Sequence, residues 1–249
     1  SEHEGVDTVT VVTEGIFNIP GVGGGLHLTR GLVADIFLGK VTKWDDPHLR
    51  RLNPTSRLPN IPIVVAHRSD PSGTSYIFTD FLSNVSGDWK SKVGTGKAVQ
   101  WPAPTSVGGK GNEGVSGVVR NTTGAIGYVE LAYALENHMD TATLQNRAGQ
   151  WLDCSQGTVA QAAATKANVS STDFSIVDRP GKFSYPIAGY SWVVVYAHPA
   201  DKSRGRIVKN ILVWLVGPQA QSLAGKLNYV PLPANVRQTA LHTLARMSV

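Results

Sequence analysis

Residues 61–82 read IPIVVAHRSDPSGTSYIFTDFL, and they indicate the fold more clearly than any other part of the chain. It opens on a continuous apolar run, Ile61 to Ala66, which is typical of a strand that is covered on both faces in a parallel sheet. Polar turn residues follow from Arg68 to Gly73, and apolar side chains then recur at helical spacing as far as Val85. The stretch therefore predicts a strand, a tight turn and a helix, with the turn at the carboxyl end of the strand.

The turn carries the side chains that an oxyanion requires. Anion sites in open α/β sheets lie at the carboxyl ends of strands, and a helix N-terminus adds unpaired N–H groups with a partial positive charge. The hydroxyls of Ser72 and Thr74 can each donate a hydrogen bond, and Gly73 lets the backbone approach a ligand closely. Arg68 can hold two oxygens at once.

Asp70 is the unusual member of this turn. A carboxylate repels an anion unless Arg68 neutralises it or the ligand donates a proton to it, and either role favours phosphate over fully ionised sulfate. A plainer interpretation is that Ser72 only caps the helix and that Asp70 only shapes the turn. From these residues alone both interpretations stay open.

Strands and helices alternate along the rest of the chain, which is typical of an α/β fold. Further strands are predicted over residues 8–18, 124–129 and 186–196, and further helices over residues 28–38, 47–52, 131–137, 158–167, 206–216, 219–226 and 234–247. A Gly-rich turn at 108–119 leads into a helix and is predicted to be structural. In the helix over 206–216 we expect five apolar side chains to face inward, namely Ile207, Val208, Ile211, Leu212 and Leu215.

Composition limits the function classes. The 249 residues carry a net charge of +5, which favours anionic partners weakly, but Lys and Arg are scattered and predict no nucleic-acid partner. One cysteine, Cys154, excludes an internal disulfide, and seven histidines without metal-ligand spacing predict no metal site. We find no apolar run of membrane-spanning length and no leader at the start of the chain, so we expect a cytosolic protein or one whose leader was removed.

Four motifs give the sequence a family resemblance. They are HRSDPSGTS at 67–75, ADIFLGKVTKW at 34–44, GKGNEGV at 109–115 and GAIGYVE at 124–130. By the order and spacing of these motifs along the chain, the sequence resembles the periplasmic phosphate-binding proteins of phosphate-specific ABC transporters, from about residue 10 to its C-terminus.

The resemblance implies an α/β, type II periplasmic-binding-protein fold with two lobes and mixed, mostly parallel sheets. It implies phosphate ligands at Arg68, Ser72, Gly73 and Thr74, with Asp70 beside Arg68. It also implies a solute-binding component of an ABC phosphate importer that is not an enzyme, has no catalytic residues and needs no cofactor or metal. The expected partners are inorganic phosphate and the membrane subunits of the transporter, and the expected location is periplasmic or extracellular, at the cell envelope, with the leader absent from this chain.

The sequence departs from the family at its start. Family members carry a further N-terminal segment that contacts phosphate from the first lobe, and its motifs do not occur here. We therefore expect residues 1–9 to form a loose start or crossover, residues 10–183 a complete phosphate-binding lobe and residues 184–249 the C-terminal part of an incomplete lobe. Apolar surface on that last part would be exposed, so we expect its elements either to dock against another chain or to pack in a rearranged way.

Two other functions compete with phosphate transport. The chain could be a truncated lobe that acts as an interaction or surface protein with a weakened anion site. It could also be a hydrolase with Ser72 as nucleophile, but no general base, metal pair or Gly-x-Ser-x-Gly motif accompanies that serine.

Overall fold

The computed structural model describes residues 3–166, 168–170 and 172–249. Its elements, in chain order, are β1 (His3–Asn18), β2 (Leu26–Leu28), α1 (Arg30–Phe37), α2 (Pro47–Leu52), β3 (Val64–Arg68), α3 (Gly73–Val85), α4 (Gly87–Lys92), β4 (Ser106–Gly109), α5 (Gly111–Asn121), β5 (Ala125–Glu130), α6 (Leu131–Glu136), β6 (Ala142–Gln145), β7 (Trp151–Leu152), α7 (Gln156–Ala164), β8 (Ala188–Tyr196), α8 (Lys202–Leu215), α9 (Pro218–Lys226) and α10 (Ala234–Ala245).

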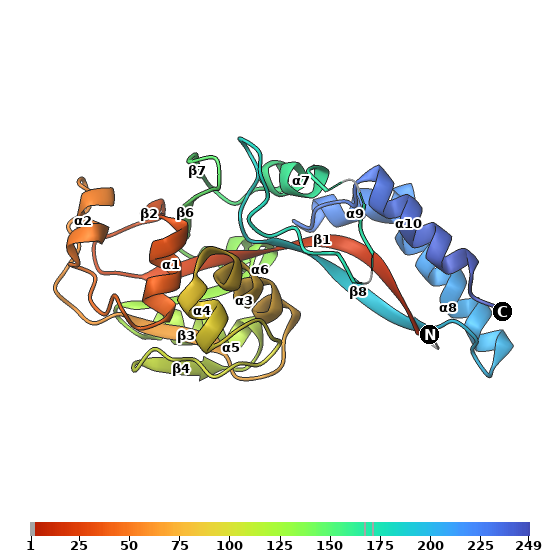
Figure 1. The fold of residues 1–249 in the computed structure, drawn as a ribbon, viewed down its shortest axis with the longest axis horizontal. Coiled ribbons are helices and arrows are strands. Elements are labelled where there is room, and N and C mark those ends of the chain that lie inside the picture. Colours follow the sequence, from red (N-terminus) through yellow and green to blue (C-terminus); the bar gives the residue numbers. More distant parts are fainter. Residues whose placement is uncertain (1–2, 167, 171) are drawn as a thin grey trace.

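Five of these strands form the main sheet, in the order β4-β3-β5-β1-β8. β3 is parallel to β4 and β5, whereas β1 is antiparallel to β5 and to β8. β1 pairs with β8 through its first half and with β5 through residues 13–18. The long strands β1 and β8 thus lie side by side and connect a larger body, residues 13–152, to a C-terminal end, residues 188–249 (Figure 1). The α/β fold with mixed sheets is confirmed.

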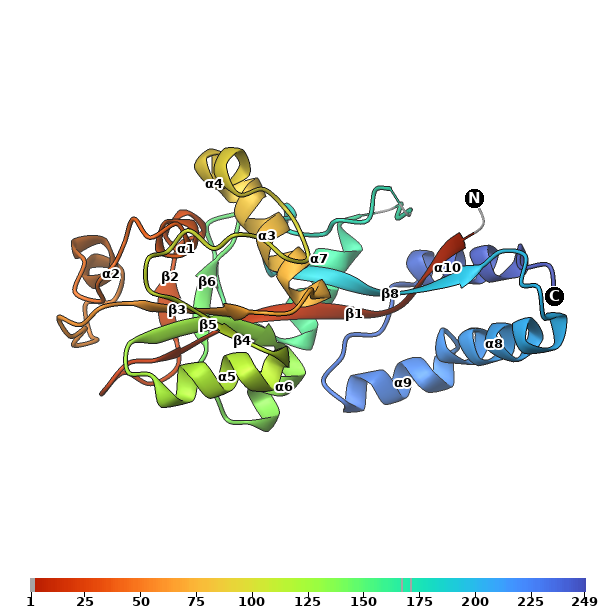
Figure 2. The same cartoon turned by 90° about the horizontal axis from the view of Figure 1, so that it is seen from below.

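Helices cover both faces of the sheet in the body. α1, α3 and α4 lie on one side, and α5 and α6 lie on the other (Figure 2). Val65 of β3 belongs to the core on the first side, with Phe78 and Tyr128, whereas its neighbour Ala66 packs on the second side with Val119. Successive side chains of a strand point to opposite faces, so burial on both faces requires the continuous apolar run that predicted this strand.

The first strand is longer than the sequence predicted. Residues 1–9 were expected to be a loose start or crossover, but β1 begins at His3, which is in register with Tyr196 of β8. A polar stretch can form a strand when a neighbouring strand supplies its backbone hydrogen bonds, and β8 does so here.

Four short strands escaped prediction. These are β4, which is parallel to β3, and the small sheet β2-β6-β7. With two to four residues each, they are too short to show a period in the sequence. β2 and β4 pair with strands far away in the chain, whereas β7 pairs with the nearby β6, and in each case the partner decides the conformation.

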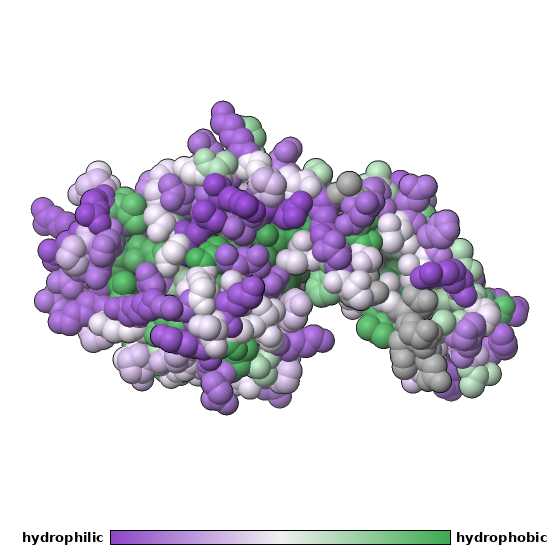
Figure 3. All heavy atoms as spheres, in the orientation of Figure 1, coloured by the Kyte–Doolittle hydropathy of each residue, from purple (hydrophilic) through white to green (hydrophobic). Residues whose placement is uncertain are grey.

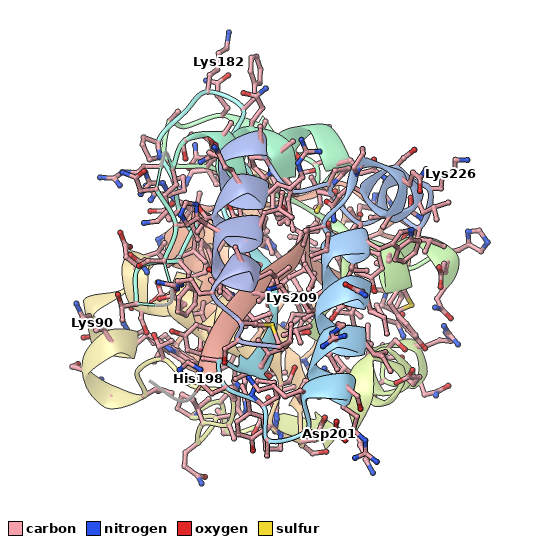
Figure 4. The ribbon with its side chains drawn as sticks, turned by 90° about the vertical axis from the view of Figure 1, so that its right-hand side faces the viewer. Lys90, Lys182, His198, Asp201, Lys209 and Lys226 are labelled. Atoms are coloured by element: carbon pink, nitrogen blue, oxygen red, sulfur yellow. The ribbon has the colours of Figure 1, made fainter. Side chains whose placement is uncertain are left out.

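The helices of the C-terminal end form close to their predicted ranges, but α8 begins at Lys202 instead of Arg206 and does not bury the predicted face. Ile207, Val208 and Ile211 are exposed, and only Leu212 of the predicted inward set is fully buried. α8 is held instead along its other side, where the Lys209 ammonium donates to the Met247 carbonyl oxygen at 3.0 Å, between α8 and the end of α10 (Figure 4). The apolar stripe was identified correctly, and the prediction of its burial was wrong because no described element packs over it.

Candidate anion-binding site

The turn after β3 is organised by an ion pair. Arg68 donates from Nε to Asp70 Oδ1 at 2.8 Å and from Nη2 to Asp70 Oδ2 at 2.6 Å. The backbone N–H of Gly111, at the start of α5, also donates to Asp70 Oδ1, at 3.0 Å. These donors, Arg68 first, hold the pKa of Asp70 well below its usual range. Asp70 therefore neutralises and orients Arg68, since both of its oxygens are already engaged.

The hydroxyl group of Tyr128 stabilises the same turn by contacts to both of its ends. Its buried hydroxyl accepts the backbone N–H of Arg68 at 3.2 Å and lies 2.7 Å from the hydroxyl oxygen of Ser75. Burial raises the pKa of Tyr128 to about 12, so the phenol keeps its proton and can donate it to Ser75. The brace connects the end of β3 to the first turn of α3.

The first residues of α3 carry hydrogen-bond donors that the helix itself does not use. Ser72 is the N-cap, and its side-chain oxygen accepts the N–H of Ser75 at 3.3 Å. Gly73 and Thr74 are the first two helical residues, so their N–H groups have no carbonyl partner within the helix. A Cβ added to Gly73 would meet no atom within 4 Å, so the space above this backbone is open.

This open space is part of a groove of about 720 Å³. Arg68, Ser72, Gly73 and Thr74 are among the residues that line it, and further lining comes from β1, β8, residues 174–177, Lys97 and Glu130. In Figure 3 the surface is hollowed between the body and the C-terminal end. The structure thus brings together four of the five predicted site residues at the groove and places Asp70 behind Arg68. Capping by Ser72 and an open donor set coexist here, so neither interpretation of the turn excludes the other.

Sequence reasoning missed two residues at this site. Glu130, the last residue of β5, accepts the hydroxyl of Thr74 on Oε1 and the hydroxyl of Tyr229 on Oε2, each at 3.3 Å. Since β5 is the parallel neighbour of β3, its carboxyl end had to emerge beside Arg68, and strand order would have predicted Glu130. Tyr229 lies in the connection between α9 and α10, and no local signal marked it.

The Gly-rich turn at 109–115 supports the site structurally. A Cβ on Gly109 would lie 2.3 Å from the backbone carbon of Gly114, so the end of β4 and the first turn of α5 can approach only because both residues are glycines. That approach places the N–H of Gly111 on Asp70. The turn therefore stabilises the Arg68–Asp70 ion pair through the hydrogen bond from Gly111 to Asp70.

Neither a metal-ligand cluster nor a helix that could span a membrane occurs in the part of the chain that the structure describes. Within it, no three His, Cys, Asp or Glu side chains come together as metal ligands would. No helix in that part has the length and hydropathy to cross a bilayer.

The fold and the site define a class: an α/β binding protein with an anion-type donor set at the carboxyl end of a parallel strand. The sequence model of the PBP superfamily domain matches residues 4–218, and the chain belongs to this superfamily.

Relatives with known names agree with this assignment. The chain is 43% identical over 215 residues to the phosphate-binding protein PstS of Xylella fastidiosa, covering 86% of this chain and 58% of that protein. It is 41% identical over 227 residues to PstS of Haemophilus influenzae, with coverages of 90% and 67%. It is 36% identical over 248 residues to PstS of Methanocaldococcus jannaschii, with coverages of 92% and 63%. The chain thus spans roughly three fifths of the length of the relatives that it matches.

Solved structures share the fold. The crystal structure of a DING protein superposes with a TM-score of 0.73 at 19% identity, over 95% of this chain and 71% of that chain. A high-affinity periplasmic phosphate-binding protein, solved with bound phosphate, gives a TM-score of 0.70 at 21% identity, over 95% and 70% of the two chains. The type II periplasmic-binding fold predicted from the sequence is confirmed.

Proposed function

We propose that this chain binds inorganic phosphate at the turn after β3, as the solute-binding component of an ABC phosphate importer. The observation that carries the proposal is the convergence of Arg68, Ser72, Gly73 and Thr74 on one open groove. The names of the relatives, phosphate-binding proteins in bacteria and an archaeon, support the same ligand. The transporter's membrane subunits are the proposed partners, and the cell envelope is the proposed location.

Each residue has a distinct role in this proposal. Arg68 supplies a guanidinium that Asp70 fixes in place, and an arginine held in one orientation loses less entropy when it binds. The N–H groups of Gly73 and Thr74 add backbone donors with the favourable end of the α3 dipole. Ser72, whose side-chain oxygen accepts from Ser75, still has its own hydroxyl proton to donate.

In this proposal the chain binds phosphate and is not an enzyme. The rival hydrolase needs a base that takes the proton of Ser72, and within the described chain no hydrogen bond joins its hydroxyl to a histidine or a carboxylate. Ser72 also caps α3 as an acceptor. Turnover of a chromogenic phosphate ester would contradict the proposal directly.

A titration with phosphate, sulfate and arsenate tests the ligand. We expect phosphate to bind and sulfate to bind much more weakly, and we expect Arg68→Ala to reduce phosphate affinity by about 100-fold or more, because a charge-assisted bidentate donor is lost. Wild-type protein that gives no signal with any of the three anions would refute the proposal.

Gly73→Ala offers a sharper test, with a matched control in the same chain. Its methyl group would enter the open space without touching the protein, so the fold should be unaffected while the anion is displaced. Gly87→Ala is the control, since Gly87 also follows a capping serine at a helix start and also faces open space. We expect only Gly73→Ala to lose phosphate. Equal phosphate affinities for the two variants would show that the backbone of Gly73 does not contact the anion.

The exposed apolar face of α8 supports a second candidate, in which the C-terminal end docks against another polypeptide chain. Ile207, Ile211 and Trp214 are all more than half exposed on one helix, and a contiguous apolar face of this kind is typical of an interaction surface. Light scattering and dye binding test it: a monomer at all concentrations that binds no ANS would contradict docking. The double variant Ile207→Ser, Ile211→Ser should abolish association and leave phosphate binding unchanged.

A further inference from the structure

The groove at the Arg68 turn has room for more than a single small anion. Its volume of about 720 Å³ lies within the range of roughly 300–1,000 Å³ that is typical of sites for organic molecules. Among the described residues that line it, two are cationic, Arg68 and Lys97, and two are anionic, Asp80 and Glu130. The formal charge of this lining is therefore zero, so an uncharged group bound next to an anion would meet no net charge there.

Aromatic side chains form a row along this groove. Tyr76 of α3, Phe174 and Trp192 of β8 all line it, and each is half-buried. The ring centroids of Tyr76 and Phe174 are 5.9 Å apart, and those of Phe174 and Trp192 are 5.2 Å apart in an edge-to-face arrangement. Gly5 of β1 leaves room for the indole, since a Cβ there would lie 3.2 Å from Cε3 of Trp192. The three rings thus contribute a continuous apolar surface to the groove.

The row begins within one helical turn of the anion-type donors. The backbone N–H of Tyr76 donates to the carbonyl oxygen of Ser72 at 3.0 Å, as expected four residues along α3. Gly73 and Thr74, whose N–H groups have no carbonyl partner within the helix, lie between these two residues. The donors and the first aromatic ring therefore belong to the same turn of one helix, and both line the groove.

A buried hydroxyl in the groove also lacks a partner. Thr13 of β1 is only 1% exposed and lines the groove, yet its hydroxyl forms no hydrogen bond with any described residue. Thr13 pairs in register with Glu130, which accepts the hydroxyl of Thr74, so it lies close to the start of α3. A buried hydroxyl without a partner costs free energy, and a bound ligand with oxygen atoms would supply the missing bond.

We infer that the groove binds an oxyanion that carries a planar aromatic group, as in an aryl phosphate monoester or an arylphosphonate. The donors of the Arg68 turn hold the anionic group, and the aromatic group packs on the row formed by Tyr76, Phe174 and Trp192. Contacts between aromatic rings stabilise such a complex beyond the contacts of the anion alone. The inference goes beyond the proposed function but rests on it, because inorganic phosphate and the aromatic ligand use the same donors.

Isothermal titration with methylphosphonate and phenylphosphonate tests the inference. Both compounds carry the same phosphonate group, and neither is an ester that could be hydrolysed during the measurement. We expect phenylphosphonate to bind the wild-type protein about tenfold more tightly than methylphosphonate, because only its ring reaches the aromatic row. Equal affinities for the two phosphonates would overturn the inference.

Phe174→Leu tests whether the row itself causes this preference. The variant keeps an apolar side chain but removes the ring that contacts both Tyr76 and Trp192. We expect the preference for phenylphosphonate to fall by about threefold or more, while the affinity for methylphosphonate stays that of the wild type. Phe183→Leu is the matched control, since Phe183 is 52% exposed and does not line the groove. An unchanged preference in folded Phe174→Leu protein would overturn the inference.

Inorganic phosphate, titrated in parallel, separates the inference from the proposed function. Wild-type protein that binds phosphate but neither phosphonate would overturn the inference and leave the proposed function intact. Wild-type protein that binds none of the three ligands would overturn both.

Discussion

The body and the C-terminal end of this molecule are built from the same kind of amphipathic helix, yet they use its apolar side chains differently. In the body, Phe78 of α3 and Tyr128 of β5 are stacked with ring centroids 4.4 Å apart and are almost inaccessible to solvent. In the C-terminal end, Ile207 and Ile211 of α8 are 59% and 56% exposed. An apolar stripe is therefore stabilising only where a second layer covers it.

The largest expected effect comes from truncating one residue in each region. Phe78→Ala should lower the free energy of unfolding by about 3–5 kcal/mol, because it opens a cavity among packed aromatic rings. Ile211→Ala, on the exposed face of α8, should change it by less than about 0.5 kcal/mol. Urea unfolding of the two variants measures both values. A loss above about 2 kcal/mol for Ile211→Ala would show that α8 is covered in solution, and the contrast would then fail.

The next effect concerns the point where β1 passes from one region to the other. Glu14 is buried there beside Cys154 and Tyr185, and burial raises its pKa to about 8, with a smaller contribution from Asp153. The folded protein then keeps a proton that the unfolded chain releases near its ordinary pKa of 4.5. Stability should therefore fall as pH rises, by roughly 1.4 kcal/mol per pH unit between about 5 and 8, and level off above the folded pKa.

Glu14→Gln should remove this pH dependence. Thermal unfolding at pH 5, 6.5 and 8 compares the variant with the wild type, and the variant should gain most at pH 8. The exposed Glu136→Gln should keep the wild-type slope. Parallel pH profiles for wild type and Glu14→Gln would show that the carboxyl group is ionised in the folded protein.

The smallest effect tests how the body holds the candidate site. Tyr128→Phe removes the hydroxyl that accepts the Arg68 N–H and bonds to Ser75, so it should cost about 1–3 kcal/mol of stability. It should also weaken phosphate binding modestly, since β3 and α3 lose their shared brace. Tyr133→Phe, on α6, is the control for a lost phenol elsewhere in the body. Unchanged stability and binding in Tyr128→Phe would mean that the ion pair alone orders the turn.

Local sequence signals predicted most of the long elements well. The helix after Asp46 matches its predicted range from Pro47 to Leu52, with the Asp46 side chain as its cap and proline at its first position. The helix after the Arg68 turn formed where the change of period placed it, whereas the strand predicted over residues 61–66 is β3 (Val64–Arg68), shifted towards the turn. Capping, turn and periodicity rules act over a few residues, so the chain itself contains the information.

Pairing between distant segments could not be predicted in this way. β1 begins at His3 because β8, nearly two hundred residues later, pairs with it. Glu130 and Tyr229 meet the anion-type turn only through strand order and through the connection between α9 and α10. The residues alone left two roles open for Asp70, as the partner of Arg68 or as an acceptor of a proton from the ligand. In the structure Asp70 accepts two hydrogen bonds from Arg68 and one from Gly111.

By itself the sequence determined an α/β chain with a donor-rich turn between a buried strand and a helix, because apolar period and turn chemistry are local properties. Its motifs also determined the family. Tertiary structure alone decided which side chains surround that turn: the brace from Tyr128, the carboxylate of Glu130 and the open space above Gly73. It also decided that α8 leaves an apolar face uncovered, since burial depends on what packs against a helix and not on the helix's own sequence.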